Sequence, residues 1–215
     1  MIAGGVLARM ILALALLASA VQTDARQSAG HALPEPADRS SEFFESLLQP
    51  GDFVFRRGYG MVSDQIVRIL GGSKALSHSG VLVGGGDDEW LVIHTVSSAL
   101  SELDGIRIEP LASFIADARP GSVSFVRLIG PFSQGQQMAE AAKSLLAEDR
   151  PFDHQFELGT HALYCSELLW TLLPPEVRER VTRQHPSLGI LLFETFFDEQ
   201  FFQIVLPPEG AGYRD

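Results

Sequence analysis

The chain is poor in positive charge. It has 16 Lys and Arg residues against 27 Asp and Glu residues, which gives a formal net charge of -11 at pH 7. Proteins that bind nucleic acids need clusters of Lys and Arg to pair with phosphates, so this balance argues against a nucleic-acid partner. It also disfavours binding to an anionic membrane surface, although contact with a membrane stays open for a chain that could act on a lipid.

The chain also lacks a second cysteine. Cys165 is alone, so no intramolecular disulfide can form. A lone thiol suits either a buried structural residue or a reactive one. The proportions of 46% hydrophobic and 20% charged residues are ordinary for a globular protein with a core. No internal repeat is present, and the length predicts one domain once the N-terminal segment is set aside.

The apolar run Met10–Val21 is short for a membrane span, which needs roughly 20 apolar residues. Arg9 precedes this run, and Ala18, Ser19 and Ala20 end it with the small-x-small pattern of a signal-peptidase site. We therefore expect a signal peptide over residues 1–20, cleaved after Ala20, and a protein exported to the periplasm or the extracellular space. An uncleaved N-terminal anchor is the alternative.

Two further segments follow. Residues 21–40 contain Gln, Ser, Ala, Pro and Asp with few apolar side chains, which predicts a flexible leader. Residues 41–215 form the folded domain. Hydrophobic periodicity and turn residues predict strands over 53–56, 77–83, 90–96, 106–108, 123–127 and 201–206. They predict helices over 41–48, 61–70, 111–116, 134–147, 164–173 and 175–182. This mixture indicates an α+β fold, a small antiparallel sheet with helices beside it.

Cys165 lies where loop-like residues give way to a helical pattern, in the segment Tyr164–Trp170 (YCSELLW). At the N-terminus of a helix, the macrodipole stabilises a thiolate. The free N–H groups of the first turn, that of Cys165 included, can hold an oxyanion. A buried structural cysteine is the alternative, since unpaired cysteines are often buried.

Two histidines interrupt neighbouring predicted strands. His78 lies in SHSGVLV and His94 lies in WLVIHTV, with Gly84–Asp88 as the turn between them. If the hairpin is symmetric about Gly86, His78 faces His94 directly, with Cβ atoms about 4.5–5.5 Å apart. One imidazole could then orient the other, as the base and orienting residue of a thiol triad do. Taken singly, each histidine would more often be a core or surface residue.

Three segments carry a resemblance to a known family: Pro50–Phe55 (PGDFVF), Ser77–Val83 (SHSGVLV) and Tyr164–Leu168 (YCSEL). Together they resemble the permuted papain-like enzymes of the YaeF/YiiX group, which belong with the NlpC-type cell-wall peptidases and the lecithin:retinol acyltransferase-like proteins. In that group the histidine precedes the cysteine, as it does here. The resemblance implies a circularly permuted papain-like fold, with a small antiparallel sheet or barrel packed against helices.

The resemblance also implies roles for single residues. Cys165 is the nucleophile, with its own N–H in the oxyanion hole, His78 is the general base, and His94 takes the place of the third polar residue. A thiol hydrolase of this kind cleaves an amide bond, such as one in a cell-wall peptide or a small peptide, through a thioester. Tyr164 and Glu167 beside the nucleophile are the candidate substrate-binding residues, although Glu167 also suits a helix-start or ion-pair role.

Two alternatives stay open. The same chemistry could act on a lipid, as in an acyltransferase or phospholipase, or the chain could be a non-catalytic ligand-binding domain of the same fold. His154, His161 and Cys165 match no standard zinc spacing, so we expect neither a metal nor a cofactor. The sequence does not favour any particular oligomeric state.

Overall fold

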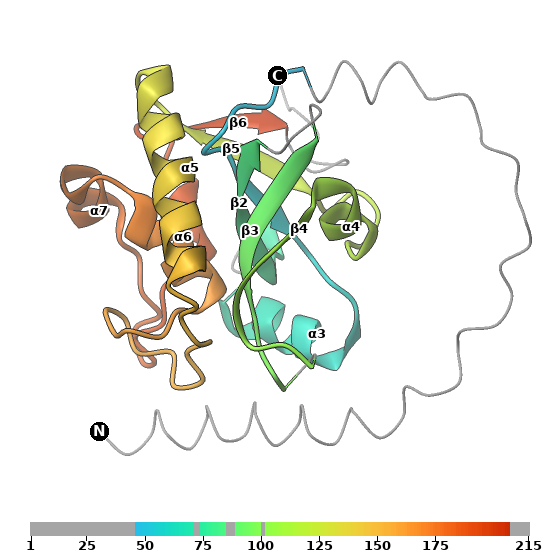
Figure 1. The fold of residues 1–215 in the computed structure, drawn as a ribbon. Helices are drawn as coiled ribbons and strands as arrows, with labels where there is room; N and C mark the ends of the chain where they lie inside the picture. The colour runs from blue at the N-terminus through green and yellow to red at the C-terminus, as the bar shows by residue number, and fades with distance from the viewer. Residues whose placement is uncertain (1–45, 71–73, 85–88, 100–101, 207–215) are drawn as a thin grey trace, which may run out of the picture.

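The computed structural model describes residues 46–70, 74–84, 89–99 and 102–206 (Figure 1). The strands of this part of the chain are β1 (Phe53–Arg56), β2 (His78–Gly84), β3 (Trp90–Val96), β4 (Gly105–Pro110), β5 (Ser124–Leu128) and β6 (Phe202–Leu206). The helices are α3 (Gly60–Leu70), α4 (Leu111–Ala116), α5 (Phe132–Ala147), α6 (Cys165–Leu172), α7 (Pro175–Val181) and the 3-10 helix η2 (Phe193–Phe196).

The strands form one sheet in the order β4-β3-β2-β1-β5-β6. Every neighbouring pair is antiparallel, and the sheet is open, with β4 and β6 at its edges. Helices α5 and α6 lie on one side of the sheet and α4 lies on the other (Figure 1). The expected α+β fold is therefore confirmed, and of the two predicted forms, sheet or barrel, the sheet is the one observed.

Strand β1 is central and buried on both faces. Phe53 and Phe55 point toward α5 and α6 and pack edge-on against the aromatic rings of η2, with ring centroids 5.5 Å apart for Phe53 and Phe196. Val54, between them, points to the other face and packs with Leu82 and Phe114 of the α4 side. The alternation of side chains along a strand thus divides the core into two clusters, one on each face.

The predicted elements agree with the observed ones to within one or two residues at most ends. The predicted helix over 41–48 is not helical over residues 46–48, and its first five residues lie outside the described ones. Helix η2 was not predicted, because a single 3-10 turn is too short to create a helical period. The predicted signal peptide and leader also lie outside the described residues.

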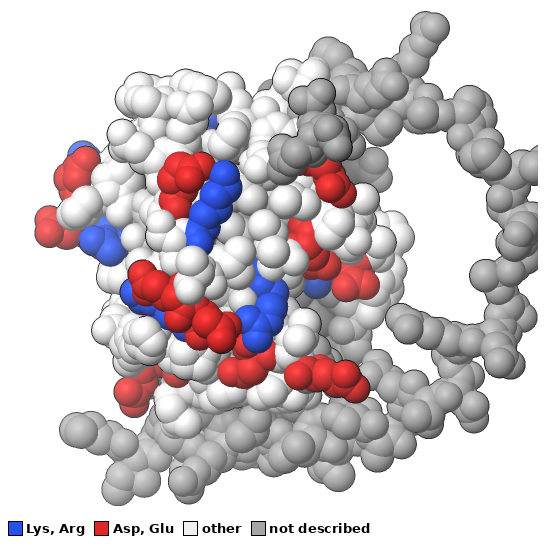
Figure 2. All heavy atoms as spheres, viewed as in Figure 1, with Lys and Arg blue, Asp and Glu red and all other residues white. Residues whose placement is uncertain are grey.

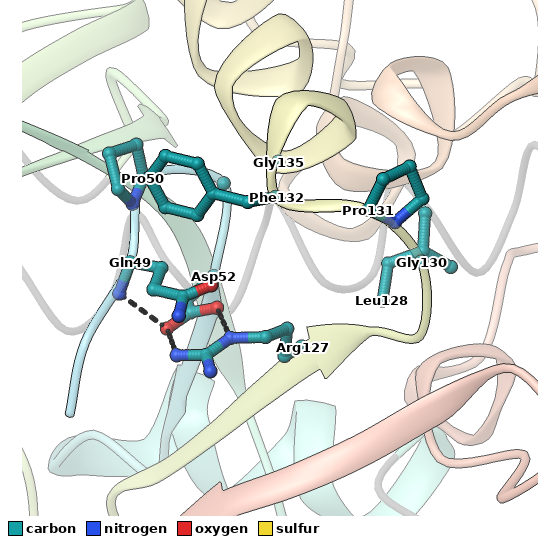
Figure 3. Close-up of a pocket in the computed structure, with 10 residues that line it drawn as sticks. Gln49, Pro50, Asp52, Arg127, Leu128, Gly130, Pro131, Phe132 and Gly135 are labelled. Atoms are coloured by element: carbon teal, nitrogen blue, oxygen red, sulfur yellow. Dashed lines mark hydrogen bonds and ion pairs between the residues drawn. The ribbon is translucent and has the colours of Figure 1, made fainter.

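The start of β1 lies beside the start of α5, next to the ion pair of Asp52 with Arg127 (Figure 3). Gly51 has a φ of +89°, and a Cβ on it would lie 2.2 Å from the carbonyl oxygen of Gly135. Beside it, the buried Asp52 carboxylate accepts two hydrogen bonds from Arg127, each of 2.7 Å. The hollow that these residues line lies at the opposite end of β1 from Arg56, the residue that pairs with His78.

Acidic and basic side chains are interspersed on the face that Figure 2 shows. Several of them form ion pairs on or beside α5: Lys143–Glu140, Arg150–Glu148 and Arg107–Asp149. Exposed pairs of this kind stabilise a fold only weakly. Among the described residues, no helix is both long and apolar enough to cross a membrane.

Candidate active site

His78 and His94 meet, as the sequence predicted. Nε2 of His78 lies 2.9 Å from Nδ1 of His94. The predicted register, however, is wrong. His94 lies opposite Gly80 and not opposite His78, so the two imidazoles contact each other diagonally across the ladder. Because the slip is by two residues, both side chains remain on the same face of the sheet.

Gly80 leaves the space in which this diagonal contact forms. A Cβ at Gly80 would lie 2.4 Å from Cγ1 of Val92 and 3.2 Å from Cβ of His94. A side chain at position 80 would therefore collide with Val92 and press on His94. The absence of one lets the ring of His94 approach that of His78.

Glu109 of β4 extends the histidine pair. Its Oε1 lies 3.1 Å from Nε2 of His94, so that Glu109, His94 and His78 form a continuous chain. Sequence reasoning missed Glu109, because the register of β4 against β3 was unknown. In the observed register Glu109 faces Val92, which puts its carboxylate on the same face as His94.

The series of hydrogen bonds from Glu109 to His78 determines which ring nitrogens carry protons. The hydrogen bond from His94 keeps the pKa of Glu109 below its ordinary value, so Glu109 is an ionised acceptor. In the form of the pair in which both rings are neutral, His94 donates from Nε2 and accepts at Nδ1, and His78 donates from Nε2. The tautomer of neutral His78 thus has an unprotonated Nδ1, which is the form a general base requires.

Phe114 and Arg56 surround His78. The Phe114 ring stacks on His78 with centroids 5.5 Å apart, and it meets His94 edge-on at the same distance. The guanidinium of Arg56 lies 4.4 Å from the centroid of that Phe114 ring. Burial, the neighbouring His94 and the charge of Arg56 together hold the pKa of His78 well below its ordinary value. His78 is therefore neutral near pH 7.

Cys165 is the first residue of α6, one residue after the start of the helix that the sequence predicted. Its helix packs on β2 and β3. The pairing of these two strands ends at Gly80 and His94, so the N–H of Ser79 lies beyond the last pair. That N–H is one of the groups that stabilise the Cys165 thiolate. The thiol therefore lies where the β2–β3 ladder ends.

The expected low pKa of the Cys165 thiol is not found. Burial raises it to about 11, and the hydrogen-bond donors of Ser79, Ser166 and Cys165 itself offset only part of that effect. The sequence revealed the helix N-terminus but not the burial, and desolvation of the thiolate outweighs the N–H groups of a single helix end. The resting thiol is thus protonated at neutral pH.

His78 and Cys165 reach the end of the ladder from opposite faces of the sheet. Cys165 packs with the cluster on the α6 side, whereas His78 lies against Phe114 on the α4 side. In the described part of the chain His78 is hydrogen-bonded to His94, and no hydrogen bond joins His78 to Cys165. Ser79 connects the two, because it follows His78 in the chain and lies beside the thiol.

The candidate substrate-binding residues are buried. Glu167 is 0% exposed, and its Oε1 accepts a 2.6 Å hydrogen bond from the N–H of Gly159. The Tyr164 hydroxyl accepts a hydrogen bond from the N–H of Leu191, and burial raises the pKa of that hydroxyl. Both side chains hold loops in place next to Cys165. Their positions favour the supporting role over contact with a substrate amine.

The comparisons with known proteins identify the family and the fold. The model of a family described as permuted papain-like amidase enzyme, YaeF/YiiX, C92 family, matches residues 47–193. Among solved structures, the chain is similar to the metalloprotein YiiX from Escherichia coli O157:H7, with a TM-score of 0.58 and 20% identity. That similarity covers 74% of this chain and 97% of the other, and at this identity it shows the fold alone. No curated protein matches the chain.

The histidines in the described part of the chain do not fit a metal site. Both ring nitrogens of His94 are already engaged, one with His78 and the other with Glu109. His154 lies against Asp104 at 3.1 Å, and His161 is exposed. Within the described residues, no group of three or more His, Cys, Asp or Glu side chains is arranged to hold a metal ion. No step of the chemistry below is therefore routed through a metal.

Proposed function

The chain belongs to the permuted papain-like amidase family of the YaeF/YiiX group, and on this basis we propose that it is a cysteine-dependent amidase exported from the cytoplasm. The observation that carries the proposal is the hydrogen-bonded series Glu109–His94–His78. It leaves Nδ1 of His78 unprotonated on β2, the strand on which the helix of Cys165 packs. A base held in one tautomer beside a nucleophile at a helix N-terminus is the arrangement that thiol catalysis uses.

The proposed reaction has two stages. In the first, Nδ1 of His78 takes the proton of the Cys165 thiol while the sulfur attacks the amide carbonyl carbon. The C–N bond then breaks, His78 passes its proton to the leaving amine, and a thioester remains on Cys165. In the second stage His78 takes a proton from water, the water oxygen attacks the thioester, and the carboxylic acid leaves as the thiol is restored.

The resting site is neutral under this proposal. The thiol pKa of about 11 and the lowered pKa of His78 disfavour a preformed thiolate–imidazolium pair in the free protein. Proton transfer then accompanies the attack on the substrate carbonyl. The N–H of Cys165, at the first position of α6, is the proposed donor to the oxyanion.

The proposed substrate is a peptide amide, in the cell wall or in a small peptide. The family description supports the amide bond. The predicted signal peptide, with its apolar run and its Ala18-Ser19-Ala20 cleavage pattern, supports a substrate outside the cytoplasm.

Hydrolysis of a panel of peptide amides, including cell-wall peptides, tests the proposal. We expect the wild-type chain to release an amine from a member of this panel and Cys165→Ala to lose at least about 10³-fold in rate, because the nucleophile is gone. Mass spectrometry of the wild-type chain, quenched during turnover, is expected to detect the acyl group as a thioester on Cys165.

Vesicles of a phospholipid form the second arm of this experiment, and His161→Ala is the control, since His161 is exposed and is not a member of the histidine pair. Release of a fatty acid, with no response to any peptide amide, would replace the amide substrate by a lipid one. Turnover that is equal in wild type and Cys165→Ala would remove the thiol mechanism.

A further inference from the structure

The hydroxyl of Ser79 is buried without a hydrogen-bond partner. Ser79 is 0% exposed, and its Oγ forms no hydrogen bond within the described part of the chain. A buried polar group that is left unpaired destabilises a fold, so it needs a physical reason. Strand alternation puts this hydroxyl on the same face as Val81, which is the face on which α6 packs.

Several N–H and O–H groups near Cys165 favour the thiolate form of its sulfur. The side chain of Ser79 is the group that most favours the thiolate, followed by the N–H groups of Ser166, Ser79 and Cys165. The N–H of Ser79 is available because β2 and β3 separate after Gly80. Two N–H groups come from the first turn of α6, where no carbonyl can accept them.

A thiolate accepts stronger hydrogen bonds than a thiol does. We propose that Ser79 is a catalytic residue, whose hydroxyl and N–H donate to the sulfur of Cys165 once His78 has taken its proton. This inference rests on the proposed function and adds a residue to it. In this step the S–H bond breaks, the proton moves to His78 Nδ1, and the electron pair stays on the sulfur. The orphaned hydroxyl of the resting site is then a donor held ready for that charge.

Ser124 provides a matched control. It too is 0% exposed, and its Oγ also has no hydrogen-bond partner among the described residues. Ser124 and Ser79 both face Phe55, one from β5 and the other from β2, so the two hydroxyls lie on the same face of the sheet. Ser124 lies on the far side of β1 from the thiol, and Ser124→Ala therefore removes the same group without touching the sulfur.

The test measures the pH dependence of iodoacetamide alkylation of Cys165 in the full chain, for wild type, Ser79→Ala, Ser79→Thr and Ser124→Ala. We expect Ser79→Ala to raise the pKa of the thiol by about 1 and to slow alkylation at a fixed pH about tenfold. Ser79→Thr keeps the hydroxyl and is expected to restore most of the rate, and Ser124→Ala to match wild type. In amide hydrolysis, Ser79→Ala should lower kcat and leave KM unchanged.

Equal thiol pKa values in wild type and Ser79→Ala would overturn the inference, and so would equal effects of Ser79→Ala and Ser124→Ala. Circular dichroism checks that each variant is folded, and Ser79→Gly, which also lacks the hydroxyl, replaces Ser79→Ala if that variant does not fold. The thiol measurement needs no turnover. If the wild-type chain hydrolyses nothing while Ser79→Ala still raises the thiol pKa, the proposed function fails and the contact of Ser79 with the sulfur stands.

Discussion

Gly80 lies directly across from His94, on the face of the sheet that carries both imidazoles. We expect Gly80→Ala to displace His94, because the new methyl group would lie 2.4 Å from Cγ1 of Val92. Overpacking of this kind destabilises a fold by about 1–3 kcal/mol. Amide hydrolysis should fall at least about tenfold, since His78 loses the residue that fixes its tautomer. Urea unfolding and an activity assay measure the two effects.

Gly84 is the control for this substitution. It lies at the other end of β2, and a Cβ there would meet nothing within 4 Å. Gly84→Ala is expected to change neither stability nor activity. An unchanged activity in Gly80→Ala would mean that the histidine pair does not support the reaction.

The histidine pair could be predicted from the sequence, although its register could not. Hairpin symmetry put His78 opposite His94, and the observed slip of two residues preserved the face on which they meet. Glu109 could not be predicted, because its role depends on how β4 pairs with β3. A glutamate near the end of an edge strand is typical of a solvated surface position.

At the scale of elements, α6 is attached to the loop before it by a buried carboxyl group. Glu167 accepts from the N–H of Gly159, its second oxygen has no hydrogen-bond partner among the described residues, and burial raises its pKa to about 7. Asp153 adds to this rise, and Arg150 opposes it. Because the folded-state pKa lies above the ordinary value, Glu167 stabilises the fold fully only where it is protonated in both states.

This contribution is therefore present below about pH 4.5 and is lost as the pH rises to about 7. We expect Glu167→Gln to remove this part of the pH dependence, on the order of 2 kcal/mol between pH 5 and 8. The free energy of unfolding in urea, measured at several pH values, tests this. Glu148→Gln is the control, because the Glu148 side chain is 48% exposed. Identical pH profiles for wild type and Glu167→Gln would contradict the assignment.

The bounds of a helix or strand could be predicted from the sequence where the hydrophobic pattern covers the whole element. Strand β3 and helix α4 begin and end where the sequence predicted, at Trp90–Val96 and Leu111–Ala116. The order of the strands could not be predicted in the same way. Strand β1 pairs with β5, which lies far along the chain, and only the packing of both faces of the sheet selects that partner.

At the scale of the whole molecule, one open sheet separates two sets of side chains. The proposed nucleophile comes from the helix on one face, and the proposed base with His94 and Glu109 comes from the other. Ser79, which follows His78 in the chain and interacts with the Cys165 thiol, lies where β2 and β3 separate. The sequence indicated His78 and His94, which interrupt apolar strands, and Cys165, which lies where a helical pattern begins, but it did not indicate Glu109. It could not indicate how deeply the thiol is buried, and its expected low pKa was wrong for that reason.

The central claim is that His78 takes the proton of Cys165, and the rate of iodoacetamide alkylation in His78→Ala tests it most directly. His154→Ala is the control, because His154 is bonded to Asp104 and lies outside the histidine pair. At pH 7 we expect Cys165 to react at least about tenfold more slowly in His78→Ala than in wild type, and equally fast in His154→Ala. Equal rates of alkylation in wild type and His78→Ala at pH 7 would contradict the account.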